Sequence, residues 1–207
     1  MAHVGANTIS VNEALRRLRE GNKAFVAGNG NLNPRHRPTP GSAKQNPFAI
    51  ILGCSDSRVP AEIVFNQGLG DLFVIRVAGN IIAPSLVGSV EFAAANFGTR
   101  LVVVLGHTHC GAVEATLDQL VEPADHRSPN LAAIIERIRP AVEPVLAANP
   151  NAERDALVSA AVTANIHTSV NQLRHGSAIL AELVEHHDLA IVGAEYSLET
   201  GLVEFLD

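Results

Sequence analysis

Two short segments of the sequence carry residue types that bind metals and move protons. The segment CSDSR at residues 54–58 follows one apolar run, and the segment GHTHCG at residues 106–111 follows another. If the two segments are neighbours in the fold, Cys54, His107 and Cys110 converge on one ion. Two thiolates and one imidazole form a soft ligand set that suits tetrahedral zinc. The pattern therefore predicts a zinc site built from these three side chains.

Other interpretations of the two cysteines stay open on this evidence. Free cysteine is among the most buried residue types, so Cys54 and Cys110 could be unrelated core residues. A redox disulfide could join them if the two loops meet, although it would give no role to His107, Asp56 and Arg58. A phosphate-binding thiolate loop is a weaker interpretation, because no glycine-rich nest lies between Cys54 and Arg58. The position of both cysteines after apolar runs favours the metal site.

His109 is the alternative imidazole ligand. Its side chain is expected to point away from that of the adjacent Cys110, whereas His107 lies three residues from Cys110 and can share one side of a turn with it. We therefore favour His107. Most of the other histidines are expected at the surface or in the core without a metal, because they have no ligand-like partners at an informative spacing. They include His167, His175, His186 and His187.

Apolar runs indicate the strands that must position these segments. Residues 48–52, 72–75 and 101–105 are continuous runs typical of parallel strands covered on both faces, and residues 191–192 lie in a fourth candidate. The Ala-rich stretch 85–97, which ends before a glycine, indicates a crossover helix. This alternation predicts a single α/β domain around a mainly parallel β-sheet flanked by helices. In such sheets functional groups gather beyond the carboxyl ends of the strands.

The first part of the chain predicts a helical arm. Ser10 and Glu13 fit a capping box, in which a hydroxyl and a carboxylate satisfy free backbone donors at the start of an amphipathic helix. The stretch 28–46 is rich in Pro, Gly and Asn and indicates an ordered arm or loop. Residues 1–46 are thus expected to form a helix and arm of one domain that spans residues 1–207.

Two later stretches, 130–146 and 152–187, are largely helical in pattern. We expect breaks near Pro140, Pro150 and Gly176, because proline and glycine interrupt helices. The sequence has no internal repeat and no low-complexity tract, which agrees with one domain.

Composition and charge exclude several classes of function. The chain has 207 residues, 47% hydrophobic and 17% charged, so it can bury a sizeable core and is not a disordered protein. Its net charge is −6 and no basic block is longer than residues 35–37, which argues against nucleic acid or an anionic membrane as a partner. The apolar runs are far shorter than the ~20 residues that span a bilayer. Residues 1–10 contain no secretory signal, which predicts a cytoplasmic protein.

Taken together, the motifs resemble those of the β-class carbonic anhydrases. CSDSRVPAE at residues 54–62 precedes the GHTHCG segment, and GDLFVIR at residues 70–76 is similar to the family's second-strand segment. Residues 196–206 are similar to its C-terminal strand region. The similarity covers most of the chain, with these elements in the family's order and spacing. It implies a zinc enzyme that reversibly hydrates CO2 to bicarbonate and a proton, for which zinc supplies hydroxide from bound water.

The resemblance also implies roles for individual residues. Cys54, His107 and Cys110 would hold one zinc ion per chain. Asp56 would either pair with Arg58, which leaves the fourth zinc position open, or bind zinc itself and close that position. Both residues are present, so the sequence leaves the choice between these two arrangements open.

An apolar CO2 pocket at a subunit interface is implied as well. Phe73 and Phe92 match its lining, and Gln45 matches a residue that reaches the substrate from the partner subunit. The expected assembly is therefore a homodimer or a homotetramer, with CO2 and bicarbonate as the small-molecule partners.

Part of the family has a second pocket through which bicarbonate inhibits the enzyme. Arg76 and Tyr196 match two of its positions, but Ile51 stands where Trp is expected, and the chain contains no Trp. The resemblance therefore does not support regulation through this pocket.

Two alternative functions stay open at this stage. Related folds hydrolyse linear analogues of CO2 such as carbon disulfide through a narrower apolar pocket. In the second alternative, Cys54, Asp56, His107 and Cys110 close the shell permanently and zinc only supports folding. Arg58 argues against that closed site, because a purely structural site gains little from a residue that competes for its fourth ligand.

Overall fold

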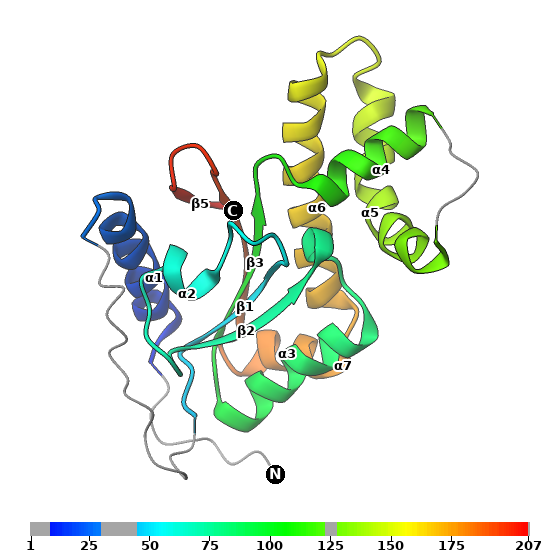
Figure 1. Cartoon of the computed structure of the whole chain (residues 1–207). Helices are drawn as coiled ribbons and strands as arrows, with labels where there is room; N and C mark the ends of the chain where they lie inside the picture. Colours follow the sequence, from blue (N-terminus) through cyan, green and yellow to red (C-terminus); the bar gives the residue numbers. More distant parts are fainter. Residues whose placement is uncertain (1–8, 30–44, 123–127, 207) are drawn as a thin grey trace.

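The computed structural model describes residues 9–29, 45–122 and 128–206. Most of the predicted arm, residues 30–44, therefore lies outside the described residues. One five-stranded sheet runs through the molecule in the order β2-β1-β3-β4-β5 (Figure 1). The first four strands of this order pair in parallel, and the last pair is antiparallel. The strands are β1 (Ala49–Cys54), β2 (Leu72–Val77), β3 (Leu101–His107), β4 (Ala190–Tyr196) and β5 (Val203–Leu206).

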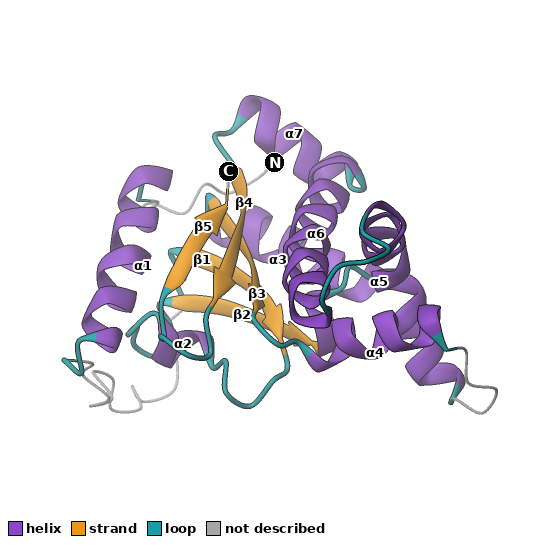
Figure 2. Cartoon of the chain, turned by 90° about the horizontal axis from the view of Figure 1, so that it is seen from above, coloured by secondary structure: helices purple, strands orange, loops and turns teal. Residues whose placement is uncertain are grey.

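The helices cover both faces of this sheet (Figure 2). They are α1 (Val11–Val26), α2 (Ala61–Val64), α3 (Pro84–Phe97), α4 (Gly111–Val121), α5 (Pro129–Ala148), α6 (Arg154–His175) and α7 (Ala178–His186), with a 3-10 turn η1 (Ala78–Asn80) between β2 and α3. The predicted α/β domain with a mainly parallel sheet is confirmed. No described helix is long and apolar enough to cross a membrane.

The apolar runs form strands because both faces of the central strands are buried. Every residue of β1 and β3 is buried. Ile50 and Leu52 pack with the apolar sides of α3 to α7, whereas the intervening Ile51 packs with α1 and α2. Both faces of these strands need apolar side chains. Their sequences are therefore unbroken apolar runs rather than alternating apolar and polar residues.

The two central strands extend further than the apolar runs predict. Cys54 is the last residue of β1 and His107 is the last residue of β3, so neither lies in a loop after its strand. Gly53 stays in the ladder opposite Leu105, and Gly106 stays opposite Glu195. The side chains of Cys54 and His107 therefore both begin from backbone that belongs to the sheet.

Helix boundaries agree with most of the predicted start and stop signals. The crossover helix is confirmed as α3, and Gly98 ends it in the left-handed conformation, with φ of 67°. Breaks near Pro150 and Gly176 are also confirmed. The expected break at Pro140 is wrong, because α5 continues through Pro140 and Pro144. Both prolines are exposed, so water can hydrate the carbonyl groups that lose their helical partners.

The start of α1 is only half a capping box. The Ser10 hydroxyl accepts a hydrogen bond from the Glu13 backbone N–H at 3.2 Å, as predicted. The Glu13 carboxylate, however, accepts hydrogen bonds from the Arg16 and Arg17 side chains at 2.7 to 2.8 Å. The predicted return bond from that carboxylate to the helix start is therefore wrong. Charge-assisted bonds to guanidinium groups are stronger than a bond to a neutral amide.

Glu13 should make the stability of the protein depend on pH in the acidic range. Hydrogen bonds from Arg16 and Arg17 lower the pKa of Glu13 from 4.5 to about 2. A carboxylate with a lowered folded-state pKa stabilises the fold above its unfolded-state pKa, and the stabilisation disappears as pH falls through the folded-state value. We therefore expect Glu13→Gln to lower Tm slightly at about pH 7, with a difference that shrinks as pH falls towards about 3.

Thermal unfolding of the parent and the Glu13→Gln variant, followed by circular dichroism at several pH values, checks this expectation. A difference in Tm that stays constant or grows as the pH falls would contradict it.

Candidate metal centre

The sheet topology brings the two chemistry-bearing segments together. Because β1 and β3 are parallel neighbours, their carboxyl ends place Cys54 and His107 side by side, and Cys110 follows at the turn that begins α4. All three side chains are buried, and their ligand atoms lie within 4.8 Å of one another. The prediction that these three residues converge is confirmed. Separate core cysteines are thereby excluded.

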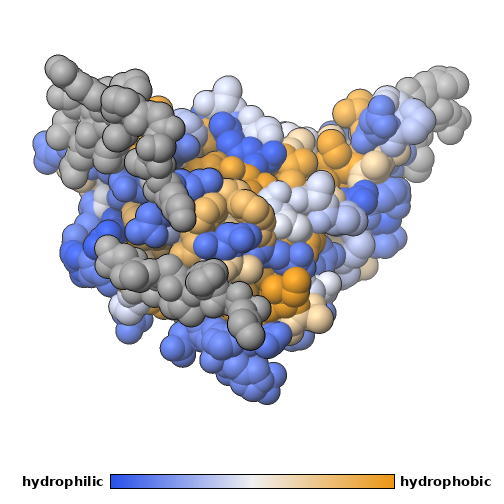
Figure 3. Space-filling model, turned by 90° about the horizontal axis from the view of Figure 1, so that it is seen from below, coloured by the Kyte–Doolittle hydropathy of each residue, from blue (hydrophilic) through white to orange (hydrophobic). Residues whose placement is uncertain are grey.

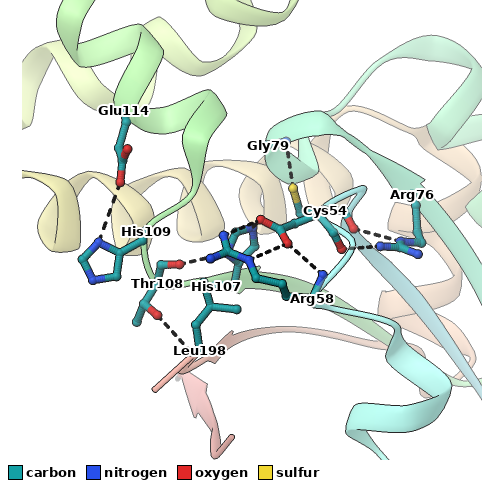
Figure 4. Close-up of polar contacts among 10 residues, drawn as sticks. Cys54, Arg58, Arg76, Gly79, His107, Thr108, His109, Glu114 and Leu198 are labelled. Atoms are coloured by element: carbon teal, nitrogen blue, oxygen red, sulfur yellow. Dashed lines mark hydrogen bonds and ion pairs between the residues drawn. The ribbon is translucent and has the colours of Figure 1, made fainter. Parts of the chain in front are cut away.

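The imidazole of His107 is oriented for a metal. Its Nδ1 lies 2.9 Å from the carbonyl oxygen of Thr108, which can only accept, so Nδ1 carries the proton (Figure 4). The other nitrogen, Nε2, is buried and has no hydrogen-bond partner among the described residues. A buried acceptor without a partner is costly, and a cation at the cluster would satisfy it. The site therefore fits zinc.

Each of the two cysteines shifts the pKa of the other. The neighbouring Cys110 side chain lowers the pKa of Cys54 to about 4, and Cys54 together with burial raises the pKa of Cys110. The backbone N–H of Gly79 also donates to the sulfur of Cys54 at 3.4 Å. Both cysteines are free, so the structure does not support the disulfide interpretation. Thiols bind a metal in their deprotonated form, so a divalent cation would displace the protons that this pair retains.

Asp56 lies beside the cluster but does not join it. Its carboxylate accepts hydrogen bonds from Nε and Nη2 of Arg58 at 3.0 and 2.7 Å, and a third from the Arg58 backbone N–H at 2.9 Å. These bonds hold the pKa of Asp56 well below its usual range. The nearer oxygen is 3.9 Å from Nε2 of His107. Of the two arrangements left open by the sequence, the structure therefore has the one paired with Arg58.

Arg76 has a contact that the sequence analysis missed. Its Nε donates to the carbonyl oxygen of Cys54 at 2.9 Å, and its Nη2 donates to that of Asp56 at 2.6 Å. These bonds follow from the register of β1 and β2, which pairs Arg76 with Gly53. Arg76 therefore supports the loop that carries Asp56. Tyr196 and Ile51, the other residues compared with a bicarbonate pocket, are buried.

The residues expected to line a CO2 pocket lie away from the cluster within one chain. Phe73 pairs in register with Ile50. Ile50 lies four residues before Cys54 on β1, a separation of about 13 Å along the strand. The ring centroid of Phe73 is 6.4 Å from that of Phe92, which is 51% exposed on α3. Gln45 is exposed before the start of β1. Figure 3 shows apolar patches on one face of the molecule. The role of these three residues stays a prediction.

Apart from His107, the histidines that the structure describes lie at the surface, as expected for most of them. His109 is exposed, has φ of 53° and turns towards Glu114, with 3.8 Å between its Nδ1 and the carboxylate (Figure 4). It is not among the three clustered ligands. The other four named in the sequence analysis are all exposed: His167, His175, His186 and His187.

Comparisons with known sequences give one consistent result. A family model described as "Carbonic anhydrase" matches residues 49–203. The chain is 39% identical over 198 residues to "Carbonic anhydrase 2" of Mycobacterium tuberculosis, covering 91% of this chain and 89% of that protein. A carbonic anhydrase of Mycolicibacterium smegmatis is also 39% identical over 198 residues, with 92% and 91% coverage.

Solved structures are similar over almost the whole chain. The β-carbonic anhydrase CafA of Aspergillus fumigatus has a TM-score of 0.72 and 26% sequence identity, covering 95% of this chain and 90% of that one. A structure of tetrameric β-carbonic anhydrases from Sordaria macrospora has a TM-score of 0.71 and covers 94% of this chain and 97% of that one. At 22% sequence identity, the similarity to the Sordaria structure shows a shared fold alone.

Proposed function

Because the chain belongs to the β-class carbonic anhydrase family, we propose that it reversibly hydrates CO2 to bicarbonate and a proton at a zinc centre held by Cys54, His107 and Cys110. The observation that carries the proposal is the buried cluster of these three side chains next to an Asp56 carboxylate that Arg58 holds off the ligands. Zinc, when bound, lowers the pKa of a coordinated water so that hydroxide is available near neutral pH.

Asp56 is proposed to orient the reacting water. Because Arg58 occupies both of its oxygens from one side, the carboxylate stays ionised and keeps its position 3.9 Å from His107. An ionised carboxylate accepts a hydrogen bond but cannot donate one, so it favours a water or hydroxide that carries a hydrogen over other anions. In this arrangement Arg58 is a positioning residue.

The substrate pocket is proposed to form between two copies of the chain. Phe73, Phe92 and Gln45 lie away from the cluster within one chain, so they can approach a metal centre only in a partner subunit. The homodimer is the smallest unit that meets this requirement. A homotetramer is consistent with the tetrameric title of the Sordaria structure. The cytoplasmic location stays a prediction from the sequence.

Neither alternative function gains support from the structure. A permanently closed zinc shell would place Asp56 among the ligands, whereas Asp56 is bound to Arg58 and the cluster found among the described residues consists of Cys54, His107 and Cys110. No observation on the pocket favours carbon disulfide over CO2.

Stopped-flow hydration of CO2 by zinc-quantified protein tests the proposal, with chelator-treated protein as the blank. Two thiolates offset the charge of zinc, so we expect the site to acidify water weakly and turnover to be higher at about pH 8.5 than at about pH 7. Zinc added back to the blank should restore the activity. Protein that holds one zinc per chain and hydrates no CO2 at either pH would overturn the proposal, and consumption of carbon disulfide alone would favour that alternative.

A further inference from the structure

The turn η1 between β2 and α3 has an unusual backbone. Gly79 and Asn80 are both buried and have φ of 72° and 42°, so two successive residues adopt the left-handed region. A Cβ on Gly79 would lie 2.7 Å from Cδ1 of Ile138 and 3.0 Å from Cβ of Ala112. Nδ2 of Asn80 is buried without a hydrogen-bond partner among the described residues. Such strain persists only where the surrounding structure holds it, and it is common at functional sites.

The turn reaches the metal centre through one backbone hydrogen bond. The N–H of Gly79 donates to the sulfur of Cys54 at 3.4 Å (Figure 4). A hydrogen bond to a ligating thiolate withdraws electron density from sulfur and fixes the direction of its lone pairs. It therefore affects both the strength and the geometry of the metal–sulfur bond.

Two side chains from α6 hold this turn in place. Nδ2 of Asn165 donates to the carbonyl oxygen of Gly79 at 2.8 Å, and the Ser169 hydroxyl donates to that of Asn80 at 3.1 Å. Both side chains are 2% exposed, and their spacing of four residues places them on one face of the helix. The two bonds fix the carbonyl groups of the residue that carries the N–H and of the residue after it, so they hold the backbone from which the Gly79 N–H is directed at Cys54.

We infer that Asn165 and Ser169 are positioning residues of the metal centre, which hold η1 so that its N–H is directed at the Cys54 thiolate. The inference rests on the zinc site of the proposed function. It predicts that loss of either donor weakens zinc binding beyond any general loss of stability. The role requires no contact between α6 and the metal.

Four substitutions separate this role from a structural one. Asn165→Leu removes the amide donor at similar volume, and Ser169→Ala removes the hydroxyl, whereas Ser169→Thr keeps it. Thr163→Val is the matched control, because Thr163 lies on the same helix and hydrogen-bonds Glu195 rather than the turn. Zinc affinity is measured by competition with a chromophoric chelator, and the stability of the metal-free protein by thermal unfolding.

Zinc affinity should fall about 10- to 100-fold in Asn165→Leu, and less in Ser169→Ala. Ser169→Thr and Thr163→Val should bind zinc as the parent does, even if the unfolding temperature of metal-free Thr163→Val falls. With Co²⁺ in place of zinc, the sulfur-to-cobalt absorption band should move to lower energy in Asn165→Leu, because the thiolate loses a hydrogen bond.

Equal zinc affinity in Asn165→Leu and Thr163→Val would overturn the inference while leaving the proposed function intact. If Asn165→Leu does not fold, the two Ser169 variants test the inference. Weaker zinc binding in Ser169→Ala but not in Ser169→Thr supports it, and equal zinc binding in the two variants overturns it. A parent protein that binds no zinc would overturn the proposed function and this inference together.

Discussion

Replacing Cys54 by serine is expected to abolish zinc binding and CO2 hydration together. The substitution removes one of the two sulfurs from a cluster whose ligand atoms lie within 4.8 Å of one another. A serine hydroxyl is a poor ligand near neutral pH, so His107 and Cys110 alone would hold the ion. Zinc content should fall from about one per chain to near zero after dialysis, and hydration should fall to the buffer rate.

The same variant should also lose the stabilisation that zinc gives the parent. A metal that binds only the folded state adds about 2.7 kcal/mol of stability when its concentration is one hundred times Kd. We therefore expect added zinc to raise the unfolding temperature of the parent but not that of Cys54→Ser. Metal analysis, thermal unfolding with and without zinc, and stopped-flow hydration check the three expectations.

His109→Asn is the matched control for the ligand set. His109 is exposed and lies outside the cluster, and asparagine tolerates its left-handed backbone. This variant should keep zinc and activity, whereas His107→Ala should lose both. The reverse result, with zinc lost in His109→Asn and kept in His107→Ala, would show that the ligand assignment is wrong.

Replacing Arg58 by alanine is expected to keep zinc bound while turnover collapses. Arg58 contributes no ligand, but it donates three hydrogen bonds to the Asp56 carboxylate, two of them from its guanidinium. Without the guanidinium, the carboxylate is free to turn towards the ligand cluster, from which it is separated by only 3.9 Å at His107. A carboxylate that competes for the metal removes the open position that the reaction needs.

The expected loss in turnover is about 10²- to 10⁴-fold, the range typical of a misplaced acid–base group. Arg58→Lys should recover only part of it, because an ammonium group cannot reproduce the paired bonds of a guanidinium. Arg16→Ala is a suitable control, since Arg16 is also an exposed arginine bonded to a carboxylate but lies on α1. Full turnover in Arg58→Ala, or loss of its zinc, would contradict the prediction.

Local signals in the sequence were sufficient for most of the secondary structure. The runs 48–52 and 101–105 predict buried parallel strands because a strand covered on both faces needs an apolar side chain at every position. Ser10 marks the start of α1 because its hydroxyl accepts a hydrogen bond from a free backbone N–H of the first turn. Gly98 marks the end of α3 because glycine readily adopts the left-handed conformation that ends a helix. Pro140 does not end α5, because its effect on a helix depends on whether water reaches the carbonyl groups that lose their partners.

The ligand set could be predicted because it depends on residue type and on one topological rule. Cys54, His107 and Cys110 are soft ligands at the ends of apolar runs, and neighbouring parallel strands end at the same edge of the sheet. That these two strands are neighbours was assumed in the sequence analysis, and the pairing of β1 with β3 confirms it. The family resemblance then supplied Asp56 and Arg58, and left their arrangement open.

By itself, then, the sequence determined the central strands of a mainly parallel sheet and the ligand types at their ends. Only the tertiary structure decided how the groups around those ligands are held. Arg76 supports the Cys54 carbonyl across 22 residues, Gly79 reaches the Cys54 sulfur across 25, and Asn165 reaches Gly79 across 86. These bonds depend on strand register and on how closely α6 packs against the sheet, because a hydrogen bond is lost when its donor moves by about an ångström.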